Sequence, residues 1–257
     1  MLSSLYLLVA SPSSPYIKSY HLLNLPTDTQ THSSFFQLRN RRHEQTNEEV
    51  QKEKEAKEVV AVQVEPKTGV SFPVKLDDGK QLICVGLRKE SVLGMGIKIN
   101  GFGIYADNEK LKDLLRSKIG KPPAKPTKEM YQVAVDSDVG MTVRMVIVFP
   151  GITMNMVRKN FNEGLGASIK KLTGAKKNEI TNKAMVQAPD NIKLPPGSII
   201  EISRLPGYIF QTKMMGEVVS KVESELICRA YFYMYLGDDV FDEEAKAKFG
   251  MYLLSLF

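Results

Sequence analysis

Cysteine and histidine are both scarce in this chain of 257 residues. The two cysteines, Cys84 and Cys228, lie far apart and form no CxxC or similar spacing. This argues against a disulfide scaffold and against a cysteine-based metal site. The three histidines are His21, His32 and His43. Provided that the N-terminal stretch is not part of the folded body, their position excludes Ser-His-Asp, Cys-His and histidine–metal chemistry from that body.

The chain also lacks long hydrophobic runs and the common catalytic motifs. The most apolar run, residues 145–149, is flanked by Arg144 and Pro150 and is far shorter than the ~18–20 residues that cross a bilayer. We therefore expect no transmembrane segment. Neither GxxxxGK[ST], HExxH, GxSxG nor EF-hand spacing occurs. Residues 101–106 match the loose dinucleotide pattern GxGxxA, but within an extended run and without the acid expected ~20 residues later. We expect no cofactor.

The overall composition is that of a globular protein. Hydrophobic residues make up 43% of the chain and charged residues 25%, with 18 glycines and 13 prolines. These values rule out wholesale disorder, collagen and coiled coil. A chain of this length folds as one domain, or at most two.

Residues 1–43 have the composition of an organellar transit peptide. They contain eight serines and three threonines, four basic residues and a single acid, a Ser-rich, Arg-bearing and acid-poor pattern. A plastid is favoured over a mitochondrion. Two alternatives stay open: a tail without a targeting role, and a secretory signal. For the latter, the short apolar run at 5–10 lacks a basic region before it and is shorter than usual.

The charges support a division of the chain. The net charge is +6, and residues 1–43 contribute +3 of it. The rest carries no global basic signature, so we expect no nucleic-acid partner. Residues 44–58 mix charges with almost no apolar content, as solvated linkers do. We predict a transit peptide or disordered segment over 1–45, a charged linker over 46–58 and a ligand-binding domain over 59–257.

Short β-branched runs and turn signals dominate the first part of this domain. An Asp-Gly pair at 78–79 is a hairpin signal, and glycines in the extended run 92–106 suggest bulges or bends. Leu205-Pro206-Gly207 marks another turn. The pattern predicts a mostly antiparallel sheet with strands over residues 59–64, 72–76, 81–87, 92–106, 130–135, 142–149, 198–202 and 208–211.

Amphipathic stretches predict helices over 108–118, 153–172 and 217–236. Asp107 can cap the first, Gly174 stops the second and Gly237 closes the third. Asp242 is expected near another helix N-terminus. Strands segregated from helices indicate an α+β fold with a sheet covered by helices on one face. An apolar cavity can lie between two such layers.

Arg88 is the polar residue within the sheet that admits two interpretations. It follows the apolar run 81–87 and precedes the apolar run 92–106. In one interpretation Arg88 and Lys89 occupy an exposed turn. In the other, Arg88 is a cation at the mouth of an apolar cavity, where its guanidinium can donate two parallel hydrogen bonds to a carboxylate. The pattern alone does not choose between them.

Several segments resemble the chalcone isomerase fold family. They are residues 86–94 (GLRKESVLG), 99–107 (INGFGIYAD), 149–174, 194–211 (LPPGSIIEISRLPGYIFQ) and 221–242 (KVESELICRAYFYMYLGDDVFD). They are similar to its non-catalytic plant branch, the plastid fatty-acid-binding proteins, over about residues 59–257. The resemblance implies an open-faced β-sandwich, with a large antiparallel sheet under a helical layer and the ligand between them.

The resemblance also implies which residues contact the ligand. A strand arginine contacts the ligand in this family, and Arg88 is the matching position. Twelve residues later the catalytic members carry Thr and the fatty-acid binders Tyr, whereas this chain has Asn100. This departure weakens the implied carboxylate clamp, although an amide N–H can still donate to a carboxylate. Tyr105, on the same strand, is a further candidate.

Catalytic members also use a Tyr and an Asn on the helix after the central strands. Aligned on Pro150, these positions fall at Met156 and Glu163, so both groups are absent. Closing a chalcone adds a phenolate across an enone and requires ordered hydrogen bonds around the ketone. Methionine instead suits a channel for a flexible acyl chain. The loss of these groups argues against isomerisation.

These considerations predict a non-catalytic protein of the chloroplast stroma. Its expected ligand is a free fatty acid of medium to long chain, held by Arg88, Asn100, Tyr105, Met156 and Glu163, with no metal. One alternative is a chalcone–flavanone isomerase, an intramolecular lyase. Another is a non-catalytic flavonoid-binding helper, which the transit peptide opposes because that pathway is expected outside plastids.

Overall fold

A computed structural model describes residues 61–92, 95–174 and 192–257 of the chain. These residues belong to one compact unit, Val59–Phe257. The predicted transit peptide over 1–45 and charged linker over 46–58 lie outside the described residues. Within the described residues, we find no helix with the length and apolar content of a membrane span.

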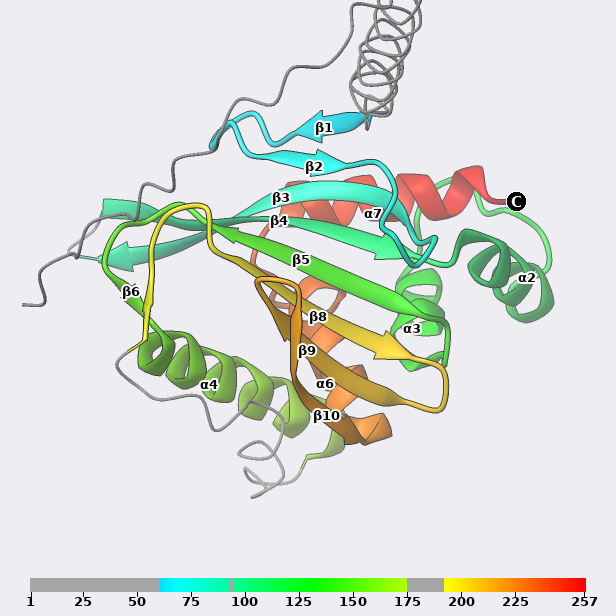
Figure 1. Ribbon diagram of the computed structural model, residues 1–257. Helices are drawn as coiled ribbons and strands as arrows, with labels where there is room; N and C mark the ends of the chain where they lie inside the picture. Colours follow the sequence, from blue (N-terminus) through cyan, green and yellow to red (C-terminus); the bar gives the residue numbers. More distant parts are fainter. Residues whose placement is uncertain (1–60, 93–94, 175–191) are drawn as a thin grey trace, which may run out of the picture. The chain divides into compact units, whose positions relative to one another are not determined.

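A six-stranded antiparallel sheet forms the centre of this unit (Figure 1). Its spatial order is β10-β9-β8-β5-β4-β3, and each neighbouring pair is antiparallel. The strands are β3 (Gln81–Val92), β4 (Met95–Ala106), β5 (Met141–Ile147), β8 (Ile199–Leu205), β9 (Ile209–Met214) and β10 (Glu217–Glu223).

Two small strand pairs accompany the sheet. In the first, β1 (Val62–Val64) pairs with β2 (Ser71–Pro73). This hairpin packs on β4, because a Cβ placed on Gly103 would lie 3.0 Å from the Phe72 ring. In the second, β6 (Ile152–Thr153) pairs with β7 (Lys193–Leu194). The β6–β7 pair holds the start of the long helix that follows β6.

The described helices are α2 (Asn108–Lys118), α3 (Lys128–Asp136), α4 (Met154–Thr173), α6 (Glu225–Leu236) and α7 (Glu243–Ser255). As predicted, Asp107 caps α2 and Asp242 caps α7, each with a side chain that accepts a backbone N–H bond. As also predicted, α4 ends at Gly174, whose φ of 70° is the left-handed cap that glycine favours.

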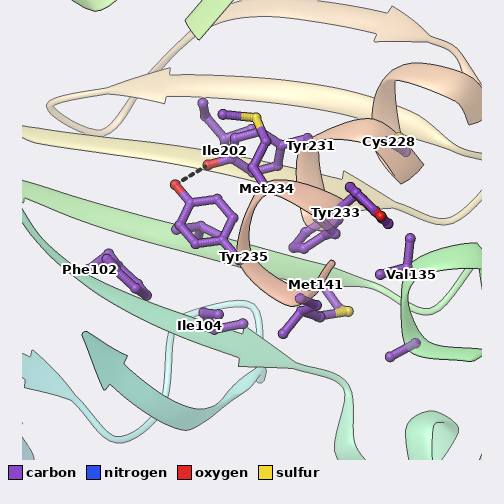
Figure 2. Packing of buried hydrophobic residues seen from close by; sticks show 14 of the residues in the cluster. Phe102, Ile104, Val135, Met141, Ile202, Cys228, Tyr231, Tyr233, Met234 and Tyr235 are labelled. Atoms are coloured by element: carbon purple, nitrogen blue, oxygen red, sulfur yellow. Dashed lines mark hydrogen bonds between the residues drawn. The ribbon is translucent and has the colours of Figure 1, made fainter. Parts of the chain in front are cut away.

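Helix α6 belongs to the core, where its Tyr231, Met234 and Tyr235 lie among buried residues of the sheet such as Phe102 and Ile104 (Figure 2). Nine of its twelve residues are buried. Its Tyr235 ring meets Phe102 of β4 edge-on, with centroids 5.1 Å apart. Helix α4 approaches α6 closely at Gly164, where an added Cβ would lie 2.6 Å from Met234 Cε. The predicted α+β fold, a sheet covered by helices, is confirmed.

Two predicted elements were wrong. Residues 130–135 form part of helix α3, because Thr127 caps it and Met130 and Ala134 bury one face at helical spacing. Residues 217–236 are not one helix, because Glu217–Glu223 is strand β10. This strand follows the turn at Gly216 (φ 89°) and pairs with β9, and α6 begins only after its cap Ser224.

Strand β3 is longer than predicted and continues through Arg88 to Val92. Its pairing with β4 extends the whole way, so the connection between these strands lies beyond Arg88. The predicted turn at Gly79 is present: its N–H donates to the carbonyl of Leu76, and its φ is 89°. Arg88 is therefore a strand residue, not a turn residue.

Arg204 of β8 holds helix α3 against the sheet. Its side chain is fully buried. The guanidinium donates to the carbonyls of Val139 (2.8 Å), Val135 (2.8 Å) and Ala134 (2.9 Å), and it stacks 4.9 Å from the Phe232 ring centroid. Burial lowers the pKa of Arg204 to about 10, so it remains a cation at neutral pH and satisfies the carbonyls at the end of α3.

Candidate functional site

A cavity of about 50 Å³ lies between the sheet and helices α4 and α6. Strands β3, β4, β5, β6 and β8 supply one part of its wall, and the two helices supply the other. The lining is Arg88, Ile99, Asn100, Met145, Ile147, Ile152, Met156, Val157, Asn160, Phe161, Ile200, Ile202, Tyr231, Met234 and Tyr235.

Most of this wall is aliphatic or aromatic, and three of its members are methionines. Met145 comes from β5, Met234 from α6 and Met156 from the first turn of α4. Met156 is also 44% exposed, so the cavity reaches the surface at this end of α4. Because methionine is unbranched and has three rotatable bonds, these walls can adapt to a ligand.

Arg88 provides the cation in the cavity wall. Its Nη2 donates to Glu90 Oε1 at 3.0 Å, and its side chain is 20% exposed. The guanidinium carbon lies 4.4 Å from the Phe241 ring centroid, a cation–π contact that holds the planar group in place. Its Nε is buried and has no hydrogen-bond partner. A buried donor without a partner is costly, so a ligand acceptor here would remove that cost.

Asn100 lies directly across from Arg88 in the β3–β4 ladder. The residue is 4% exposed, and its Nδ2 makes one long bond of 3.3 Å to the carbonyl of Gly101. Directly opposed residues on antiparallel strands project their side chains on the same face. The predicted pair of Arg88 and Asn100 is thus brought together in the cavity wall.

Two tyrosine hydroxyls from α6 lie near this polar end. Tyr231 and Tyr235 are four residues apart, and their oxygens are 3.4 Å from each other (Figure 2). The Tyr235 hydroxyl also lies 3.7 Å from the sulfur of Met145. Burial raises the pKa of both phenols, so they stay protonated at neutral pH. Such weak contacts leave them able to donate to a ligand oxygen.

Glu90 connects strand β3 with helix α4. Its Oε1 accepts a hydrogen bond from Arg88 Nη2 and a second, at 2.9 Å, from Asn160 Nδ2. Its side chain is 34% exposed. The cation of the cavity is therefore paired with a carboxylate of the same strand.

Two of the candidate ligand-binding residues do not line the cavity. Tyr105 is fully buried, but it shares a strand face with Gly103, beneath Phe72 of the β1–β2 hairpin. Because alternate residues of a strand point to opposite faces, it lies on the other side of β4 from Asn100. Glu163 is exposed on α4 and does not contribute to the lining. Met156 does contribute.

Sequence reasoning missed four polar residues at this end of the cavity: Glu90, Asn160, Tyr231 and Tyr235. The spacing of the two tyrosines is a signal for a shared helix face, but the spacing does not show that this face meets the cavity. Asn160 precedes the buried Phe161 and carried no signal of its own. Glu90 follows Arg88 by two residues, which on a continuous strand indicates the same face.

The site can hold an elongated apolar molecule that ends in a hydrogen-bond acceptor or an anion. The cavity offers a guanidinium, two amides and two phenols at one end and apolar walls elsewhere. Among the described residues, there is no group of three or more His, Cys, Asp or Glu side chains placed to hold a metal ion.

The chain is similar to three curated plant proteins. Chalcone isomerase-like protein 1 of Humulus lupulus is 59% identical over 207 residues, which cover 79% of this chain and 97% of the relative. Fatty-acid-binding protein 1 of Arabidopsis thaliana is 35% identical over 190 residues, covering 72% and 68%. Fatty-acid-binding protein 2 of the same plant is 28% identical over 197 residues, covering 73% and 50%. No family model matches the sequence.

The fold is also that of a solved structure. The crystal structure of an Arabidopsis thaliana fatty-acid-binding protein matches with a TM-score of 0.72 and 34% sequence identity. The match covers 76% of this chain and 98% of the other. At this identity the likeness extends beyond the general architecture to a family relationship.

Proposed function

The chain belongs to the chalcone isomerase-fold family of plant fatty-acid-binding and chalcone isomerase-like proteins, and from this premise we propose that it binds a free fatty acid without converting it. The acyl chain occupies the cavity between the sheet and helices α4 and α6. The carboxylate lies at the end formed by Arg88 and Asn100.

One observation carries this proposal: Arg88 is a cation in the wall of a mainly apolar cavity. Its Nε is buried without a partner, and the donor amide of Asn100 lies on the opposed strand. A carboxylate can accept from both groups, and charge-assisted bonds of this kind are about twice as strong as neutral ones. The arrangement favours an acid over an ester or an alcohol of the same length.

The volume of the cavity sets a condition on binding. Its 50 Å³ holds a few water-sized groups, whereas pockets for whole ligands span roughly 300–1,000 Å³. An acyl chain therefore enters by displacing side chains of the wall. Met145, Met156 and Met234 are the residues suited to this movement, because rotation about their χ angles costs less than moving a branched or aromatic side chain.

The energetics of burial are compatible with reversible binding. A chain of about 11–15 methylenes gains roughly 9–12 kcal/mol on burial, at ~0.8 kcal/mol for each group. Association costs of about 4–15 kcal/mol offset much of this gain. We expect dissociation constants around the micromolar range. The Arg88 end then orients the ligand and selects acids, more than it supplies raw affinity.

Two features support a non-catalytic role. Met156 stands in the cavity at a position where the resemblance places a catalytic tyrosine, and Glu163, at the position of the catalytic asparagine, lies outside the cavity. Isomerisation requires ordered donors around both the ketone and the attacking oxygen. We propose that the protein does not close chalcones, and an assay of chalcone turnover by the full chain tests this directly.

A second candidate is a non-catalytic flavonoid binder. The observation in its favour is the aromatic part of the wall, in which the rings of Phe161 and Tyr231 have centroids 5.8 Å apart. Such rings can stack on a flat polyphenol. Competition between laurate and naringenin chalcone for the same protein separates the two candidates, because the proposed fatty-acid carrier binds laurate more tightly.

We propose the plastid stroma as the location of the protein. The Ser-rich, Arg-bearing and acid-poor composition of residues 1–43 supports this proposal. The full chain fused at its C-terminus to a fluorescent protein is expected to enter plastids in plant cells. Fluorescence in the cytosol or in mitochondria would contradict the proposed location.

Native mass spectrometry of the full chain, purified from bacteria, tests the proposed function. We expect adducts in the mass range of fatty acids on the wild-type protein and a smaller fraction of protein carrying them in Arg88→Gln. A clean mass without ligand, together with no uptake of added C12–C18 acids, would contradict fatty-acid binding.

A further inference from the structure

Glu90 occupies the point at which donors from two different elements meet. It lies two residues after Arg88 on β3, and both side chains lie on the same face. Its Oε1 accepts from Arg88 Nη2 at 3.0 Å and from Asn160 Nδ2 at 2.9 Å. One donor comes from the sheet and the other from α4. Two donors converging on one carboxylate oxygen is the arrangement that a ligand carboxylate requires.

Two other hydrogen-bond donors at the polar end of the cavity make weak hydrogen bonds or none. Arg88 Nε is buried and unpartnered, and Asn100 Nδ2 makes only its long bond of 3.3 Å to Gly101. A ligand carboxylate that used these groups would approach the guanidinium beside Glu90. Two carboxylates on one guanidinium repel each other, because only one negative charge is balanced. The Arg88–Glu90 pair thus lowers the attraction of this end for an acid.

Glu90 is free to leave this position. Its side chain is 34% exposed, so after rotation the carboxylate can be solvated by water at little cost. We propose that Glu90 is a resident carboxylate which a fatty-acid carboxylate displaces from Arg88 and Asn160, so that Glu90 sets the affinity and the acid selectivity of the cavity. This inference rests on the proposed function.

The substitution Glu90→Gln isolates the charge from the shape. Glutamine keeps an oxygen that accepts from Arg88 and Asn160, and it has almost the same volume. It removes the negative charge that competes with the ligand. We expect laurate to bind roughly two- to fivefold more tightly, the range for a partly exposed charge pair. Dodecanol, which carries no charge, is expected to bind as it does to the wild type.

Isothermal titration of the full chain with laurate and with dodecanol provides the test. Glu217→Gln is the matched control, because Glu217 is an exposed glutamate on β10 outside the cavity lining. Tighter binding of laurate alone, by Glu90→Gln alone, supports the inference. It is overturned if Glu90→Gln binds laurate no more tightly than the wild type, or if both ligands gain equally, which would indicate a change of cavity shape.

The same titrations distinguish failure of the proposed function from failure of the inference about Glu90. If the wild type, Glu90→Gln and Glu217→Gln all bind neither laurate nor dodecanol, fatty-acid binding itself is contradicted, and the inference about Glu90 falls with it. Binding of laurate by the wild type with no change in Glu90→Gln contradicts the inference alone.

Discussion

Arg88 of β3 and Asn100 of β4 are direct cross-strand partners, and both side chains line the cavity under helices α4 and α6. A guanidinium and an amide are thereby held side by side by the backbone ladder of two twelve-residue strands. A site built on strands is held more rigidly than one on loops. The pair gives the otherwise apolar cavity a fixed polar end.

Removal of the cation is expected to abolish the preference for acids. In Arg88→Gln the affinity for laurate should fall roughly ten- to a hundredfold, the range for hydrogen bonds to charged groups, while that for dodecanol stays within about twofold. Lys89→Gln is the matched control, because Lys89 is exposed and outside the lining. Isothermal titration provides the measurement. Equal losses for both ligands would contradict a head-group role for Arg88.

A carboxylate introduced at the opposed position should compete with the ligand. Asn100→Asp is nearly isosteric and places a negative charge beside Arg88, so the two side chains can pair with each other. We expect laurate affinity to fall by about fivefold or more, with dodecanol unaffected. Displacement of a bound fluorescent probe measures the affinities for laurate and for dodecanol. An unchanged laurate affinity would show that the carboxylate of the bound laurate lies elsewhere in the protein.

Helix α4 provides a test of where the acyl chain lies. Met156→Asp places a charge in the cavity wall, yet the first turn of a helix favours an acid, so the fold should be retained. Laurate and dodecanol should both lose roughly tenfold or more, because a charge is costly against an acyl chain. Glu163→Ala, on the exposed face of the same helix, should bind both as the wild type does. Weaker binding by Glu163→Ala, together with unchanged binding by Met156→Asp, would place the acyl chain on the opposite face of α4.

The buried Arg204 supports the fold and not the site. Arg204→Met leaves the carbonyls of Ala134, Val135 and Val139 without donors, so we expect about 3–5 kcal/mol less stability in urea denaturation. Arg229→Met, which breaks a partly exposed ion pair with Asp136 (2.7 Å), should cost less than about 1 kcal/mol. Similar losses in the two variants would contradict this role of Arg204.

The sheet-and-helix architecture could be predicted because it depends on local pattern, whereas the Arg88–Asn100 pair could be named only through the resemblance to the family. Turn signals at Gly79 and Gly207 separate strands whose order follows the chain, and the resemblance to the family supplied the pair. Two elements could not be assigned from pattern. The β-branched Val133 and Val135 favour a strand, but Thr127 caps a helix that includes both residues. Residues 217–223 form a strand because they pair with β9.

The rest of the site depends on how helices pack on the sheet. Asn160 meets Glu90 only because α4 lies over β3, and no spacing within the sequence encodes that distance. The side-chain face of Tyr105 follows from the register of β4, which a glycine-interrupted run leaves undetermined. Glu163 illustrates the same limit, since an alignment on Pro150 does not specify which face of α4 meets the cavity.

A crystal structure of the full chain with laurate is the most direct test of the account. We predict the acyl chain between the sheet and helices α4 and α6, with its carboxylate within hydrogen-bond distance of Arg88 and with Glu90 turned away from the guanidinium. Laurate bound outside this cavity, or with its carboxylate directed away from Arg88, would contradict the account.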